Sequence, residues 1–191
     1  MKNCNGGEKH LTKLCPEDYT TSVWSGGKTT QLVIEPPGVS YAERTFLWRI
    51  SSATVETKES DFTPLRGEMR LRHNDRGEIC LRPYDVHRFS GADRTHSFGC
   101  CTDFNLMLRR DRTGGDMEAI RLHKESRELH PDPRAEKLLL YCAEGECLLR
   151  AGAEQLQLRP GESGLVTDAA VLPLSVEGEA AILLLCQMWR V

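Results

Sequence analysis

Two polar side chains interrupt an otherwise apolar run in "FGCCTDFNLMLRR", residues 98–110. Asp103 and Asn105 are two residues apart, and strand side chains alternate between faces, so the carboxyl and the amide share one face. On the inner face of a barrel they can hydrogen-bond a polar ligand, or they can tie the strand to its neighbours. The sequence leaves both uses open.

A positive charge interrupts a second apolar run, "FLWRISSATV", residues 46–55, in which Arg49 and Ser51 share a face and Trp48 lies on the other. A buried guanidinium must be paired, because desolvation otherwise costs several kcal/mol. An ion pair with Asp103 would satisfy Arg49. A ligand carboxylate would do so too, through two parallel hydrogen bonds, and this cost favours a functional role for Arg49.

The other candidate ligand contacts are polar or aromatic groups near these strands. Thr30, Ser51 and Asn105 can orient a ligand by hydrogen bonds, and Trp48 can pack on a planar part of it. Arg70 is a candidate for the ligand or for a structural loop contact. His87 and His96 flank the turn at residues 89–91, near the expected barrel mouth, where either can act as a general base. His73, beside a predicted turn, is expected to be in solvent.

Composition excludes several classes of partner. The chain has 191 residues, of which 39% are hydrophobic and 28% charged, with a net charge of −3. Its basic residues are dispersed, which argues against nucleic-acid binding. No apolar run is long enough to span a membrane, and the first residues lack the apolar centre of a signal peptide, so a cytoplasmic location is expected. The eight cysteines contain no CxxC pair and are expected to be reduced.

Short β-rich runs separated by Gly and Pro turns predict an all-β protein. Strands are expected to end at Pro36–Pro37, to cover 45–56 and 95–110, and to form hairpins about residues 74–77, Gly145 and Gly178. A short helix is expected near Pro16–Tyr19. "DRTGGD", residues 111–116, is expected to be a mobile loop.

The second half of the chain resembles a cupin half-barrel. "LRPGESGLV", residues 158–166, is similar to the Pro-Gly-Asp/Glu turn that enters such a barrel. Cupin metal sites use two histidines one residue apart, then a carboxylate and a later histidine. That pattern is missing here, so neither a metal nor another cofactor is predicted.

The first half is similar to the HutD/Ves family of bicupins in four stretches. These are "VWSGGKTTQL" (23–32), "WRISSATV" (48–55), "DFTPLRGEMR" (61–70) and "RFSGADRTHSFGCCTDFNLMLRR" (88–110), in the family's order and spacing. Ser25, Lys28 and Arg66 depart from the family pattern. The resemblance implies a bicupin, with one barrel over residues 1–113, a second over 114–191, and strands that can cross between them.

The resemblance also implies a function linked to histidine utilisation. The expected partner is a small carboxylate metabolite such as urocanate or formylglutamate, which the protein would sense or buffer. An alternative is a metal-independent isomerase or hydrolase acting on a small acid, with Asp103 or His87 as acid or base. A third is a scaffold whose outer sheet faces bind a partner or a second copy, and a homodimer is possible.

Overall fold

The structure, a computed structural model, describes residues 9–55, 64–66, 69–74 and 76–191, and these residues are almost entirely β-strand. Within them, the helical elements are two 3-10 turns, η1 (Pro16–Asp18), near the position expected, and η2 (Tyr41–Glu43). The predicted all-β class is therefore confirmed. No helix in the described residues is long and apolar enough to cross a membrane.

The chain divides into two compact units. The carboxyl-terminal unit contains the described residues up to Cys15 together with Ile120–Trp189, and the amino-terminal unit contains Pro16–Ala119 with Arg190–Val191. Strand β10 (Thr113–Leu129) passes from one unit into the other, so the chain divides within a strand.

The expected loop over 111–116 was wrong beyond residue 112, because β10 begins at Thr113. The buried hydroxyl of Thr113 lies within hydrogen-bond distance of the carbonyl oxygens of Leu47, at 3.1 Å, and of Arg109, at 3.0 Å. These contacts fix the start of the strand, and the polar composition around the two glycines did not reveal them.

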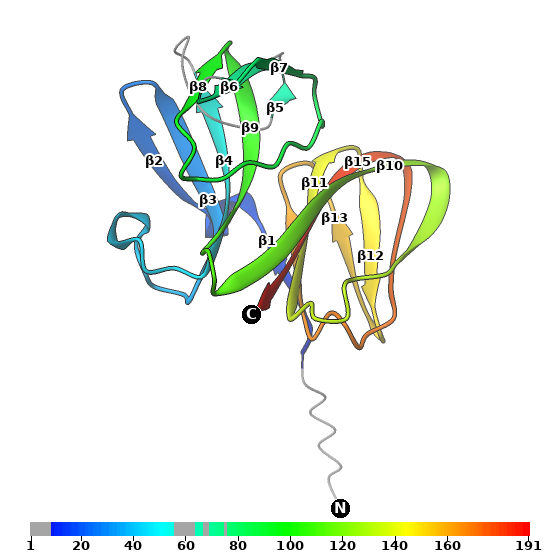
Figure 1. The fold of residues 1–191 in the computed structure, drawn as a ribbon. Coiled ribbons are helices and arrows are strands. Elements are labelled where there is room, and N and C mark those ends of the chain that lie inside the picture. Colours follow the sequence, from blue (N-terminus) through cyan, green and yellow to red (C-terminus); the bar gives the residue numbers. More distant parts are fainter. Residues whose placement is uncertain (1–8, 56–63, 67–68, 75) are drawn as a thin grey trace, which may run out of the picture. The chain divides into compact units, whose positions relative to one another are not determined.

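A single seven-stranded sheet forms the carboxyl-terminal unit (Figure 1). Its order is β1-β14-β11-β15-β12-β13, with β10 also paired to β15. Besides β10, the strands are β1 (Leu11–Leu14), β11 (Lys137–Glu144), β12 (Cys147–Ala151), β13 (Glu154–Leu158), β14 (Ser163–Thr167) and β15 (Leu174–Arg190).

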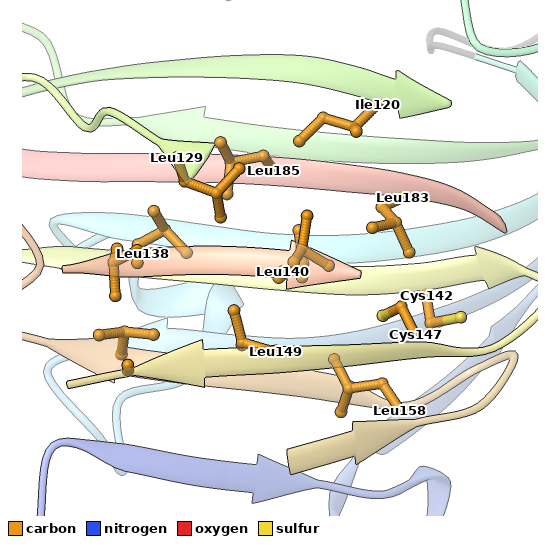
Figure 2. Close-up of a cluster of buried hydrophobic side chains, with 14 of the residues drawn as sticks. Ile120, Leu129, Leu138, Leu140, Cys142, Cys147, Leu149, Leu158, Leu183 and Leu185 are labelled. Carbon is orange, nitrogen blue, oxygen red and sulfur yellow. The ribbon is translucent and has the colours of Figure 1, made fainter. Parts of the chain in front are cut away.

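The two ends of this sheet approach each other, so that it forms a nearly closed barrel. Lys13 Nζ, on β1, donates to the carbonyl oxygen of Gln157, on β13, at 3.0 Å. Beside β1, the backbone N–H of His10 donates to the Glu154 carboxylate at 2.8 Å. The inward-facing side chains form a continuous apolar cluster, in which Leu138, Leu140 and Leu183 are fully buried (Figure 2).

Strand β15 lies between β11 and β12, which therefore do not pair with each other. It pairs with β12 over Leu174–Gly178 and with β11 over Ile182–Met188. The hairpins expected about Gly145 and Gly178 were therefore wrong. Gly178 lies inside strand β15 and forms no turn. A Cβ at this position would come within 2.9 Å of the carbonyl oxygen of Glu146, so the glycine lets the two backbones approach closely.

The amino-terminal unit contains a five-stranded sheet, β2-β3-β4-β9-β5, and a three-stranded sheet, β7-β6-β8. The strands are β2 (Thr20–Trp24), β3 (Gly27–Glu35), β4 (Trp48–Val55), β5 (Pro64–Arg66), β6 (Met69–His73), β7 (Glu78–Leu81), β8 (Thr95–Phe98) and β9 (Cys101–Leu108). These sheets do not establish a second closed barrel.

Several predicted strands of this unit are confirmed and one is corrected. Strand β3 ends before Pro36, and β6 and β7 form the expected hairpin. Asp75, in the turn of this hairpin, lies outside the described residues. Residues 61–63 and 67–68 of the third family-like stretch also lie outside them. The strand expected over 95–110 is two strands in different sheets. Gly99 separates them with φ of 125°, a conformation that favours glycine.

Replacing Gly145 by alanine is expected to destabilise the protein strongly. Gly145 has φ of 69°, which costs a residue with a side chain about 1–2 kcal/mol, and an added Cβ would overlap the carbonyl oxygen of Ala180. Gly77→Ala is the matched control, because a Cβ there meets nothing within 4 Å. Urea unfolding should show a large loss for Gly145→Ala and little change for Gly77→Ala; equal midpoints would contradict this account.

Candidate functional site

A cavity of about 640 Å³ lies within the amino-terminal unit. Its wall comes from η2 and the residues after it, the segment between β7 and β8, strand β9, and the start of β10. The lining residues are Tyr41, Arg44, Phe46, Val86, His87, Arg88, Phe89, Gly91, Asp93, Thr95, Phe104, Asn105, Leu106, Met107, Leu108, Arg109, Gly115, Asp116 and Met117. Apolar and aromatic side chains make up the larger part of this lining, and polar and charged groups are placed among them, as in many small-molecule sites.

A second hollow, in the carboxyl-terminal unit, has a different character. Half of its ten lining residues are charged, and these are Lys124, Glu125, Glu146, Glu177 and Glu179. Lys124 and Glu179 form an exposed ion pair at 2.8 Å. Solvated ion pairs of this kind contribute little energy and need no ligand, so the cavity of the amino-terminal unit is the stronger candidate.

Arg49 lies behind the wall of that cavity and is only 5% exposed. Its Nε donates to Gln31 Oε1 at 2.8 Å, and its Nη1 donates to Ser51 Oγ at 3.1 Å and contacts Met107 Sδ at 4.0 Å. All of these partners are uncharged. Nη2 has no hydrogen-bond acceptor among the residues that the structure describes.

The ring of Tyr41 covers this guanidinium. Arg49 Cζ lies 4.4 Å from the ring centroid, and Arg44 Cζ lies 3.9 Å from it, so one ring stacks on two cations. Burial lowers the pKa of Arg49, and the charge of Arg44 lowers it further, although Tyr41 acts in the opposite direction. Tyr41 and Met107 both line the cavity, so they separate Arg49 from its interior.

Of the two partners considered for Arg49, Asp103 is excluded. In the β4–β9 register Arg49 lies opposite Met107, whereas Asp103 lies opposite Ala53, four residues further along. At about 3.3 Å per residue that offset is far beyond ion-pair distance. Within the described parts of the chain, no carboxylate lies within ion-pair distance of Arg49.

Asp103 holds two strands together and is completely buried. Its Oδ1 accepts the backbone N–H of Ala53 at 3.0 Å and Nδ2 of Asn105 at 3.0 Å. Burial raises the pKa of Asp103 well above its ordinary value, although the Ala53 N–H opposes this, so the carboxyl stays protonated where an ordinary aspartate is charged. Asp103 therefore has a structural role in joining β4 to β9, whereas Asn105 lines the cavity.

The other candidates from the sequence lie in different places. Ser51 is buried beside Arg49, as proposed. Thr30 bonds Thr21 across the β2–β3 pair at 3.0 Å, and Trp48 is fully buried. Arg70 is exposed and forms an ion pair with Glu78 at 3.1 Å. Thr30, Trp48 and Arg70 do not line the cavity.

A pair of histidines lies at the cavity wall. His87 lines it, and its Nε2 is 2.8 Å from Nε2 of His73. His73 is 6% exposed, so the expectation that it is in solvent was wrong. It alternates with Met69 and Leu71 on the buried face of β6, a period that "MRLRH" already contains. His96 is exposed on β8.

Both histidine rings stack with Phe89, with centroids 4.7 Å from His73 and 5.8 Å from His87. Burial lowers the pKa of His87, and the neighbouring His73 lowers it further. In the described part of the chain, no group of three or more His, Cys, Asp or Glu side chains is arranged to hold a metal ion. The described residues therefore do not fit a cupin metal site of three histidines and a carboxylate.

Comparison with known proteins gives a consistent picture. The HutD family model matches residues 16–184. No curated protein matches the sequence significantly. A conserved protein of unknown function from Pseudomonas aeruginosa PAO1 has a similar structure, with a TM-score of 0.81 and 22% identity over 95% of this chain and 100% of that one.

Two further solved structures are similar. HutD from Pseudomonas fluorescens SBW25, determined in a formate condition, has a TM-score of 0.71 and 19% identity over 95% of this chain and 99% of that one. The oxalate decarboxylase of Lactobacillus farciminis, in a formate complex, has a TM-score of 0.64 and 10% identity over 97% and 87%. At these identities the likeness shows a common cupin-like β fold.

The free energy of unfolding is expected to depend on pH through Asp103. The pKa of Asp103 is raised in the folded protein, whereas in the unfolded chain it is about 3.9. Above that pH the unfolded chain binds fewer protons than the folded protein does. The free energy of unfolding therefore falls as pH rises. The loss is about 1.4 kcal/mol for each unit of pKa difference. Asp103→Asn, similar in shape to the protonated acid, should remove this component.

Urea unfolding of both proteins at about pH 4 and about pH 8 measures it. Wild type should lose more stability between the two pH values than Asp103→Asn does. Equal losses would mean that Asp103 is charged in the folded protein.

Proposed function

The chain belongs to the HutD family, and on that premise we propose that it binds a small organic acid through Arg49. The observation that carries the proposal is the buried guanidinium without a carboxylate partner in the described residues. Retaining an unneutralised charge inside a protein is costly. A ligand carboxylate would neutralise Arg49 and use the donors of its Nη2.

Tyr41 is the part of the site that has to move. Its ring stacks on the guanidinium, but it belongs to the short turn η2 and is 36% exposed. A rotation of this side chain would open Arg49 to the cavity without changing a strand. Arg44, which stacks on the same ring, adds positive charge near the same point.

The rest of the cavity suggests the body of the ligand. Phe46, Leu106, Leu108 and Met117 provide an apolar wall, and Asn105 and His87 provide hydrogen-bonding groups. The volume is large for formate, so an acid with an apolar or planar body and a second polar end fits better. Urocanate and formylglutamate have this character, which supports a role in sensing or buffering an acid of histidine catabolism.

An enzyme that acts on such an acid is the second candidate. His87 favours it, because its ring lines the cavity and its lowered pKa keeps it neutral and able to accept a proton. Asp103 does not support this alternative, since it is fully buried and does not line the cavity.

We also propose that the two units are the two cupin halves of a bicupin. The nearly closed barrel of the carboxyl-terminal unit and the presence of sheets in both units support this arrangement. The described cysteines are free thiols, which supports a reducing compartment such as the cytoplasm.

Replacing Arg49 by methionine is expected to weaken acid binding while keeping the fold. Methionine preserves much of the length and removes the charge, and a hydrogen bond to a charged group contributes about 1.5–3 kcal/mol. Affinity for urocanate, formylglutamate or formate should therefore fall by about ten- to a hundredfold. Thermal shift identifies the acid and isothermal titration calorimetry then measures the change.

Arg72→Met is the matched control. Arg72 is also an arginine on a strand of the same unit, but it is exposed on β6 and does not line the cavity. It should bind the acid as wild type does. If no acid raises the melting temperature of wild type, or if both variants lose affinity equally, Arg49 is not a carboxylate site.

A further inference from the structure

We propose that His73 and His87 form a pair that takes up one proton when a carboxylate enters the cavity. The proposal rests on the proposed function for the identity of the ligand, and it adds that binding depends on pH through this pair. It is carried by the geometry of the two rings, whose Nε2 atoms lie 2.8 Å apart.

The space between the rings holds a single hydrogen. At an Nε2–Nε2 distance of 2.8 Å one nitrogen must donate and the other must accept, because two N–H groups cannot face each other there. Both rings therefore cannot be doubly protonated in this arrangement. The pair can gain only one proton beyond its neutral state.

Thr95 sets the direction of the hydrogen bonds. We assign its hydroxyl hydrogen to the bond with the carbonyl oxygen of Asp93, at 3.2 Å, so that Thr95 accepts from Nδ1 of His73 at 2.8 Å. The Nε2 of neutral His73 then has no hydrogen and accepts the N–H of His87 Nε2. The remaining ring nitrogen, Nδ1 of His87, is left as an acceptor and has no partner among the described residues.

A carboxylate needs a donor at this point rather than an acceptor. Protonation of His87 at Nδ1 converts it into a charged donor without disturbing its bond to His73. An anion in the cavity favours the imidazolium, whereas the empty cavity favours the neutral ring. Binding of a carboxylate therefore draws a proton from solvent to His87.

Other charged groups near the pair modify this response without replacing it. Asp93 is held by Asn74 at 3.0 Å, and that hydrogen bond lowers its pKa, so it stays anionic near His73. Arg88 and Asp116 form an ion pair with each other. The charged groups that line the cavity with His87 are Arg44, Arg88, Asp93, Arg109 and Asp116.

The sign of the pH dependence follows. In the empty protein the pKa of His87 lies below its ordinary value, and a bound anion raises it. Between these two pKa values the affinity falls as pH rises, by at most about tenfold per pH unit for a single proton. Below and above that window, this pair makes no contribution to the pH dependence of the affinity.

Calorimetric titration with formate, in buffers of different ionisation enthalpy, measures the coupling. Formate stays ionised from about pH 5.5 upward, so protons taken up on binding come to the protein. Wild type should take up as much as one proton per formate at a pH inside the window. His87→Asn should bind without this uptake, and His96→Asn, which changes an exposed histidine of the same unit, should behave as wild type does.

His73→Asn separates the pair from a lone histidine. It removes the ring that accepts the N–H of His87 Nε2, so the uptake should persist but its pH window should shift. An unchanged pH window in His73→Asn would show that His87 acts alone and would overturn the pair.

NMR of the ring nitrogens in the ligand-free protein gives an independent check. It should find the hydrogen on Nδ1 of His73 and on Nε2 of His87, and the opposite tautomers would overturn the hydrogen-bond chain. Formate binding without proton uptake would overturn the coupling alone. Failure of every acid tested to bind would overturn the coupling together with the proposed function.

Discussion

The charge of Arg49 is the constraint on which the amino-terminal unit depends. Its guanidinium is held from three neighbouring strands, by Gln31 on β3, Ser51 on β4 and Met107 on β9. An irregularity in the β3–β4 register, between Gln31 and Val33, lets Gln31 lie opposite Ser51 while Arg49 lies opposite Ile34. The position of the guanidinium thus depends on the register of the sheet, because a different register would move Gln31 away from Arg49.

Asp103 shows how the same unit treats the opposite charge. Its carboxyl is buried without a cation, and that burial raises its pKa and so favours the uncharged form. An arginine cannot respond in this way, because its pKa lies too high for burial to discharge it near neutral pH. Burial thus leaves Arg49 charged and favours the uncharged form of Asp103, and this difference agrees with the anion proposed as the partner of Arg49.

Local patterns in the sequence were sufficient to predict several strands and their faces, but not which side chains contact each other across strands. The alternation in "WRISSATV" placed Arg49 and Ser51 on one face correctly, and Pro36 marked the end of β3. The pairing of Arg49 with Asp103 failed because it depends on the β4–β9 register, which no local period determines. The alternation in "MRLRH" was sufficient to place His73 on a buried face, and it was overlooked. The contact of His73 with His87 and the stacking of Tyr41 on Arg49 depend on how the connecting segments fold back, which no local period determines.

The position of β1 has a consequence for how the protein is made. Strand β1 leaves the ribosome early, yet it pairs with β14, about 150 residues later, beginning with Leu11 opposite Val166. The segment Pro16–Ala119 is continuous and complete well before β14 is synthesised. This continuous segment of the amino-terminal unit can therefore fold during translation, whereas the seven-stranded barrel has to wait for β14 and β15.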